Sequence, residues 1–148
     1  MNVNVDDWDL ERETVRIRHI GHRVGSDLIG AILLELLPGH RGPYHLHHGN
    51  EELALVLSGT PSVRGGSETR ELSPGELVFF LRGRDGLHAL ENHSDEPARV
   101  LLVSSKVSPD VTERPDEGLV GVFAGDVPTL GRDAPFEHFF PVATSVRG

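Results

Sequence analysis

The feature that most constrains the fold is a series of short strand-like segments, each closed by a turn rich in glycine or proline. These segments fill the middle of the chain and comprise Leu28–Leu37, Leu53–Leu57, Pro61–Arg64, Thr69–Leu72, Leu77–Leu81, His88–Asn92 and Ala98–Ser105. Turn sequences such as Gly65-Gly66-Ser67 and Ser73-Pro74-Gly75 separate them. Short strands at this spacing predict an all-β sandwich or barrel. Only Trp8–Arg18 shows weak helical periodicity.

Several of these segments do not alternate between apolar and polar residues. Leu53–Leu57 is apolar throughout, as are Ala31–Leu34 and Leu77–Leu81. A strand with one face in the core and one in water alternates, so both faces of these strands require cover. One barrel and its flanking segments supply too little material for this, and large exposed apolar patches are rare on monomers. We therefore expect a homodimer, the commonest assembly of this kind.

Length and composition limit the class of protein. A chain of 148 residues fits one domain, with a barrel core at about 28–105 and a tail, 106–148, packed on it. The absence of cysteine excludes disulfides and thiolate metal sites. The acidic N-terminus is not a signal peptide, and no apolar run could span a bilayer, which favours the cytoplasm. A net charge of −9 disfavours nucleic acid and anionic membranes as partners.

The tail differs in amino-acid composition from the barrel segment. Its hydrophobic residues are sparse and irregular, but it holds four of the six phenylalanines, namely Phe123, Phe136, Phe139 and Phe140. A disordered tail is not expected to be this aromatic. We expect either an irregular, extended arm packed on the outside of the barrel or a lid over the mouth of a pocket.

The candidate chemistry lies between Gly39 and Gly59. His45 and His47 are two residues apart, so on an extended strand both point to one face, with Cα atoms about 6.5–7 Å apart. Glu52 follows after the turn signal Gly49-Asn50, so the chain can fold back and bring a carboxylate to the same ion. Two imidazoles and a carboxylate suit divalent Zn, Fe, Mn, Ni or Co, with bonds of about 2.0–2.2 Å.

This segment resembles the first cupin motif, which is glycine, five residues, His-x-His, three or four residues, glutamate, six residues and glycine. Its five fixed positions match at every spacing, and they are Gly39, His45, His47, Glu52 and Gly59. The segment from Gly75 is similar to the second motif, with Gly75, Gly83, His88 and Asn92 in matching slots. Two departures occur there: Leu81 replaces a proline, and His88 comes two residues late after Gly83.

The resemblance covers about residues 28–105, and the overall texture is similar to a group of bacterial single-domain cupins. It implies a double-stranded β-helix, or jelly-roll barrel, with an N-terminal arm. It also implies one divalent metal ion inside the barrel, ligated by His45, His47, Glu52 and His88. A metal-free cupin that keeps the fold is the alternative.

Other polar residues near the motifs are assigned more ordinary positions. Glu51 and Glu52 are alternative ligands, and the motif spacing of six residues before Gly59 favours Glu52. Because side chains alternate along a strand, Glu51 and His48 are expected to point away from the ion. Turn positions predict solvated side chains for His40 and His93, and Asn92 is expected to be structural. Arg41, Arg82 and Arg84 are near the motif ends, where the default is surface charge and the alternative is the pocket.

These expectations support two main functions. The first is a metal-dependent enzyme acting on a small organic molecule, with the metal as Lewis acid and the reaction class open among isomerase, lyase and dioxygenase types. The three arginines suggest an anionic ligand such as a carboxylate. The second is a non-catalytic cupin that binds or senses a small molecule. A structural remnant with a filled pocket is a third, and neither substrate nor metal is specified by the sequence.

Overall fold

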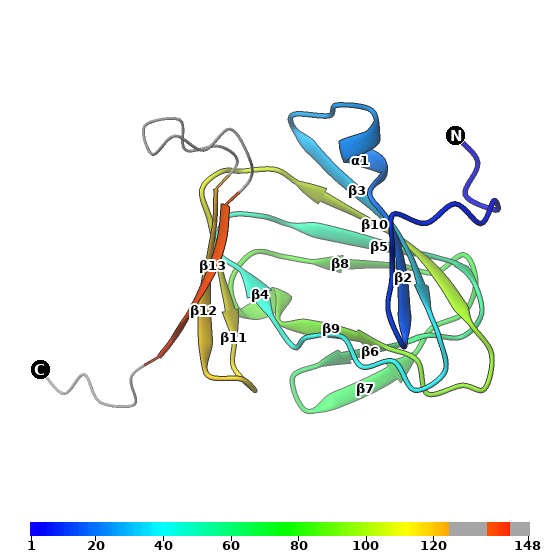
Figure 1. Ribbon diagram of the computed structural model, residues 1–148. Helices are drawn as coiled ribbons and strands as arrows, with labels where there is room; N and C mark the ends of the chain where they lie inside the picture. Colours follow the sequence, from blue (N-terminus) through cyan, green and yellow to red (C-terminus); the bar gives the residue numbers. More distant parts are fainter. Residues whose placement is uncertain (125–135, 143–148) are drawn as a thin grey trace, which may run out of the picture.

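The computed structural model describes residues 1–124 and 136–142, whose strands form two facing antiparallel layers (Figure 1). The first layer is a six-stranded sheet in the order β1-β2-β3-β10-β5-β8. Its strands are β1 (Leu10–Glu11), β2 (Val15–Arg18), β3 (Ile29–Leu36), β10 (Ala98–Ser105), β5 (Glu52–Ser58) and β8 (Leu77–Phe80). The long apolar runs of the sequence therefore lie side by side in this sheet.

The second layer is built from two smaller sheets joined through the segment 41–47. One sheet has the order β7-β6-β9, with β6 (Ser62–Gly65), β7 (Glu68–Glu71) and β9 (His88–Glu91). Isolated bridges pair Arg41 with Glu91 and His45 with His88, and the same segment then enters the sheet β13-β12-β11-β4. Its strands are β4 (Leu46–His47), β11 (Asp110–Arg114), β12 (Leu119–Ala124) and β13 (Phe136–Pro141). This arrangement confirms the predicted jelly-roll barrel.

The hydrophobic core lies between the two layers. Its buried members come from the inward positions of both layers, and they are Leu36, Ala54, Val56, Val63, Leu72, Phe80, Leu90 and Val100. On β5 the inward positions are alternate residues, so Glu52, Ala54 and Val56 share one face. Glu52 begins the strand, which places its carboxylate at the opposite end of the barrel interior from Val56.

The weak helical periodicity of Trp8–Arg18 was misleading, because this segment forms β1 and β2 instead. The backbone of β2 pairs with β3 in the register Arg16↔Glu35, and sheet pairing outweighs a weak local preference for helix. The described helices are the four-residue α1 (Ile20–Arg23) and the 3₁₀ turn η1 (Arg84–Gly86). Within residues 1–124 and 136–142, no helix has the length and apolarity needed to cross a bilayer.

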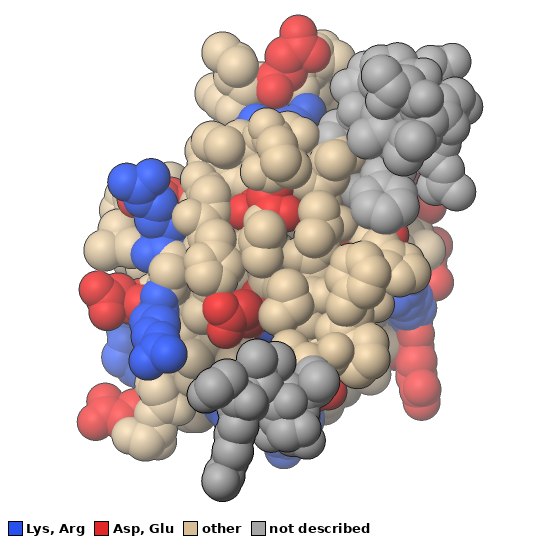
Figure 2. All heavy atoms as spheres, turned by 90° about the vertical axis from the view of Figure 1, so that its left-hand side faces the viewer, with Lys and Arg blue, Asp and Glu red and all other residues tan. Residues whose placement is uncertain are grey.

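The C-terminal tail is more regular than the sequence predicted. It contributes β11, β12 and β13, and β11 pairs with β4 in the register Thr112↔His47. The strands can form because the edge of β4 offers unpaired backbone groups. In Figure 1 this sheet stands at one end of the barrel, and Figure 2 shows that uncharged side chains cover most of its face. Its residues line a cavity beside Glu52, so the tail is neither only an outer arm nor only a lid.

Candidate metal centre

Three strands bring the predicted ligands together. His45 lies directly before β4, His47 ends β4, Glu52 begins β5 and His88 begins β9. The backbones of His45 and His88 exchange two hydrogen bonds, each with an N···O distance of 2.9 Å. The glycine that closes the first motif, Gly59, has a φ of +75°, and a Cβ there would lie 2.6 Å from the backbone of Ala98. Only glycine therefore fits the turn after β5.

The three histidine side chains converge on one carboxylate oxygen of Glu52. The Nε2 atoms of His88, His47 and His45 lie 3.4, 3.6 and 3.8 Å from Oε2 of Glu52. Two ligands bound to one ion at about 2.0–2.2 Å lie about 3.0–3.5 Å from each other, close to these separations. The ligand atoms of His45, Glu52 and His88 all lie within 4.8 Å of one another and could hold an ion.

The surroundings of the Glu52 carboxylate indicate a site for a cation. Its Oε2 atom is buried and has no hydrogen-bond partner within the described ranges, 1–124 and 136–142. Buried polar atoms normally have a partner, so each exception requires an explanation. A divalent ion among the three Nε2 atoms would supply that partner and would satisfy the chemistry of the donor set, three imidazoles and one carboxylate.

Each histidine is held through its other ring nitrogen. The Nδ1 atoms of His45 and His88 donate to the carbonyl oxygens of Pro43 and Gly86, at 2.9 and 2.8 Å. Nδ1 of His47 donates to Oδ2 of Asp110 at 2.6 Å. A neutral imidazole protonated on Nδ1 carries its lone pair on Nε2. All three rings are therefore oriented with a free lone pair toward Glu52, as in a metal site with supporting acceptors.

Burial favours the uncharged form of Glu52, His45 and His88. It raises the pKa of Glu52 and lowers the pKa of His45. For His88, burial and the neighbouring His45 lower the pKa to about 3, so its imidazole stays neutral at physiological pH. The ring of Phe80 stacks on that of His88, with centroids 3.5 Å apart and planes 2° from parallel. His88 is thus both neutral and fixed in orientation, which a metal ligand requires.

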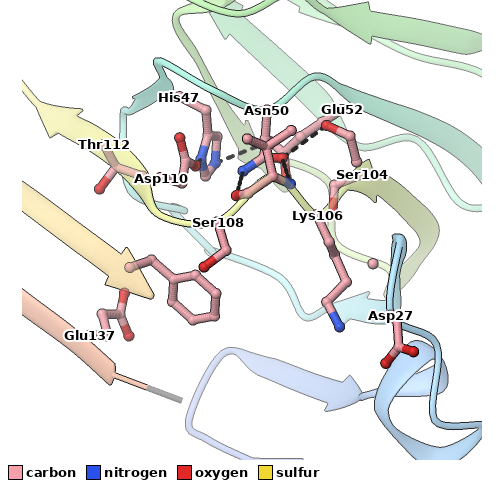
Figure 3. Close-up of a pocket in the computed structure, with 14 residues that line it drawn as sticks. Asp27, His47, Asn50, Glu52, Ser104, Lys106, Ser108, Asp110, Thr112 and Glu137 are labelled. Carbon is pink, nitrogen blue, oxygen red and sulfur yellow. Dashed lines mark hydrogen bonds and ion pairs between the residues drawn. The ribbon is translucent and has the colours of Figure 1, made fainter. Parts of the chain in front are cut away.

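Glu52 lies between two cavities of similar size and different character. The first, of about 520 Å³, is lined mostly by polar residues, which include His47, Asn50, Ser104, Lys106 and Asp110 (Figure 3). The second, of about 530 Å³, is the barrel interior beside His45 and His88. Its walls are aliphatic and come from Val15, Ile17, Ile32, Leu34, Leu36, Leu90 and Leu102. Polar residues also line it, namely Arg12, Glu13, Thr14, His40 and Arg41, and the exposed side chains of Arg12, Glu13 and Arg41 mark its rim.

The remaining motif residues lie mostly where alternation predicts. Glu51 is exposed, and His48 points away from the cluster and contacts Glu113, with 2.7 Å between Nε2 and Oε1. Asn92 is fully buried and donates to the carbonyl oxygens of Leu36 and Glu96, a structural role. His93 is 43% exposed and contacts Glu91.

One expectation about residues near the motifs needs correction, and the alternatives for the three arginines are resolved. His40 is half-buried rather than fully solvated, because it lines the aliphatic cavity and contacts Thr14 with 3.0 Å between Nδ1 and Oγ1. Of the three arginines, only Arg41 lines either of the two cavities beside Glu52 within the described residues. Arg82 and Arg84 are exposed, since the turn at η1 carries them away from the barrel interior.

Sequence reasoning missed Asp110 and Asn50. Asp110 is 2% exposed and stands 63 residues from His47 in the chain, so no local spacing indicates their contact. Asn50 was interpreted only as a turn signal, but its side chain is buried and donates to the carbonyl oxygen of Val107, at 3.1 Å. Both residues connect the first motif to the chain that follows β10, and only the fold places that chain beside it.

Comparisons with known proteins agree with this architecture. A sugar phosphate isomerase of the cupin superfamily from Silicibacter pomeroyi superposes with a TM-score of 0.75 at 20% identity, over 89% of this chain and 82% of that one. KdgF from a Halomonas species superposes with a TM-score of 0.57 at 20% identity, over 68% of this chain and 89% of that one. The polyketide cyclase RemF from Streptomyces resistomycificus superposes with a TM-score of 0.57 at 25% identity, over 66% of this chain and 70% of that one.

A search of curated protein sequences found no match. A family model of the cupin domain matches residues 32–104, the segment that contains all four predicted ligands. The motif spacing, the jelly-roll topology and the structural neighbours all agree with that match. The chain therefore belongs to the cupin superfamily.

Proposed function

We propose that this cupin is a metal-dependent enzyme that acts on a small organic molecule. His45, His47, Glu52 and His88 would hold one divalent ion, and the observation that carries the proposal is the buried, unpartnered Oε2 of Glu52 facing three Nε2 atoms. When bound, the ion supplies Lewis-acid chemistry to a carbonyl or hydroxyl group. The named structural neighbours include an isomerase and a cyclase, which supports a small-molecule substrate without selecting a reaction.

The aliphatic cavity is the better candidate for the body of the substrate. Several of its wall residues, including Ile32, Leu34 and Leu102, are only half-buried although they point into the barrel. Apolar walls with a few convergent polar groups are typical of small-molecule sites. A ligand here would place a polar group near His45, Glu52 and His88 and an apolar body along the walls.

The rim of this cavity supports a ligand that carries a negative charge. Arg12 and Arg41 line the rim, with Glu13 as the opposing charge. A guanidinium recognises a carboxylate through paired hydrogen bonds. Thermal-shift screening of hexanoate, hexanol and hexylamine on the metal-loaded protein tests this point. We expect stabilisation by hexanoate that weakens in Arg41→Gln, and stabilisation by the neutral or cationic compound alone would contradict it.

The alternative is a non-catalytic cupin that binds or senses a small molecule. The aliphatic walls favour it, because they provide no proton donor or acceptor and leave Glu13 and His40 as the titratable groups at the rim. The two functions differ in outcome. A ligand that binds and is recovered unchanged from each metal-loaded form supports the sensor, whereas a product supports the enzyme.

The ion site is tested by elemental analysis of purified protein after loading with Zn²⁺, Fe²⁺, Mn²⁺, Ni²⁺ or Co²⁺. We expect close to one ion per chain for the metal that fits. His47→Ala should lose most of it because it removes one of four donors, whereas His48→Ala removes the adjacent imidazole that contacts Glu113 and should retain it. Full occupancy in His47→Ala would contradict the ligand assignment.

We also propose a homodimer. Leu77, Phe79 and Leu81 alternate along the edge strand β8 and its end, and all three are more than half exposed. Leu53 and Leu55 of β5 lie opposite Phe79 and Leu77 in the sheet register and are half-buried. This outer face is a continuous apolar surface, and a second copy of the chain would cover it.

A further inference from the structure

Asp110 occupies an unusual position for an acidic residue. It begins β11, is 2% exposed and lies outside the segment 32–104 that the cupin model matches. Figure 3 shows its carboxylate beside the ring of His47. Oδ2 accepts from Nδ1 of His47 at 2.6 Å, and Oδ1 accepts from the backbone N–H of Gly49 at 2.8 Å. Both carboxylate oxygens are therefore committed to the chain around one predicted ligand.

This contact differs from those of the other two histidines. His45 and His88 donate to neutral carbonyl oxygens two residues away in the chain, so the local backbone orients their rings. His47 donates to a carboxylate on another strand, and such charge-assisted hydrogen bonds are shorter and stronger. A carboxylate behind a metal-binding histidine fixes its tautomer and raises the basicity of the nitrogen that faces the metal.

Backbone pairing holds Asp110 in this place. β11 pairs with β4 through Thr112↔His47 and Glu113↔Leu46, and the N–H of His48 donates to the carbonyl oxygen of Val111 at 2.8 Å. The C-terminal sheet and the strand that bears His47 therefore form one unit. A change in this sheet would be transmitted to the His47 ring through Asp110.

We propose that Asp110 is a positioning residue of the ion site, which holds His47 as the Nδ1-protonated tautomer with Nε2 directed at Glu52. The C-terminal sheet is then part of the ion site rather than an appendage to the barrel. The inference rests on the proposed function, since it assigns a role relative to the ion. A purely structural role, in which Asp110 only pins the turn at Gly49, is the competing explanation.

The variant Asp110→Asn tests whether this carboxylate matters to the ion site, because asparagine has one acceptor oxygen where aspartate has two. Its amide group must then face either His47 or Gly49. We expect the affinity for Zn²⁺, measured by competition with a chromophoric chelator, to fall by about 10–100-fold. Glu113→Gln is the matched control, since it neutralises a carboxylate on the same strand that contacts the non-ligand His48. The control should stay within about 2-fold, and an equally small change in Asp110→Asn would overturn the proposal.

A second measurement needs neither a variant nor an ion. Nitrogen-15 NMR of the histidine rings in the ion-free protein reports which nitrogen of His47 carries the proton. We expect Nδ1 in the wild type and a shift toward Nε2 protonation in Asp110→Asn. A wild-type His47 protonated on Nε2 would overturn the assignment. If the wild type binds no ion, the proposed function fails, but the tautomer still decides whether Asp110 controls the ring.

Discussion

The two faces of the six-stranded sheet share the same strands but meet different surroundings. On β5 the inward residues are Glu52, Ala54 and Val56, which reach the ion site and the core. The outward residues Leu53 and Leu55 are apolar, like Ala54 and Val56, but only half-buried. The difference shows that an apolar residue in these strands does not by itself indicate the core. An apolar residue indicates only that another surface covers it. On the inner face of the sheet, that surface is the second layer of the barrel.

The outer face is itself divided. Near β2 the N-terminal arm covers it, because Arg18 is 1% exposed and donates to backbone carbonyl oxygens of Asn2, Val5 and Asp7. Near β8 the apolar side chains remain exposed, with Phe79 at 66%. The described residues therefore cover the outer face near β2 but not near β8, where a second covering surface is needed. We expect variants on the two faces to differ in what they change.

The largest effect on stability is expected from the inner face. Leu36→Ala removes a fully buried side chain of the core and should lower the free energy of unfolding by about 2–5 kcal/mol. Leu77→Ala on the outer face is the comparison, and in monomeric protein it should cost much less because Leu77 is 54% exposed. Urea denaturation of both variants measures the difference. Equal losses would mean that the outer face is buried within one chain.

Glu52→Gln should abolish most ion binding without disturbing the fold. The amide is a poorer ligand than the carboxylate, and we expect at least about 100-fold lower affinity, roughly 2.7 kcal/mol. Glu51→Gln is a matched control, because the adjacent side chain is exposed. Isothermal titration with the preferred metal distinguishes the two. Similar affinities for both variants would place the ion site elsewhere.

Phe79→Glu should disrupt self-association. It places a charge in the exposed apolar surface of β8, where a second copy is proposed to pack, and should weaken the dimer by at least about 10-fold. Light scattering at micromolar concentration measures the mass, with Thr69→Glu on the exposed strand β7 as control. A monomeric wild type would refute the dimer and with it an interface above about 1,000 Å².

The smallest effect concerns the N-terminal arm and depends on pH. Hydrogen bonds from Arg23 lower the pKa of Asp7 and of Asp9 below the ordinary value of about 4. A lowered pKa in the folded state stabilises the fold above that ordinary value, and the contribution is lost as pH falls through the lowered pKa. Arg23→Gln should therefore lower the melting temperature slightly at pH 6 and by less at pH 2.5. A deficit of the same size at both values would exclude this ion pair as the cause.

The sequence alone determined the barrel strands and the register of the predicted ligands. The predicted strand segments became β3, β5, β6, β7, β8, β9 and β10 with boundaries within one residue, because glycine and proline turns limit a strand locally. The period of two put His45, His47 and Glu52 on one side and Glu51 and His48 on the other. The two extra residues before His88 were absorbed by the turn η1, so its side chain still reaches Glu52.

The tertiary structure decided what no local pattern contains. It paired β11 with β4 and brought Asp110 to His47 across 63 residues, and strand pairing depends on which edges meet rather than on neighbours in the chain. It also divided the space around Glu52 into a polar and an aliphatic cavity and placed Arg41 at the rim of one. A cavity is defined by side chains from several strands at once, so its character appears only when the layers face each other.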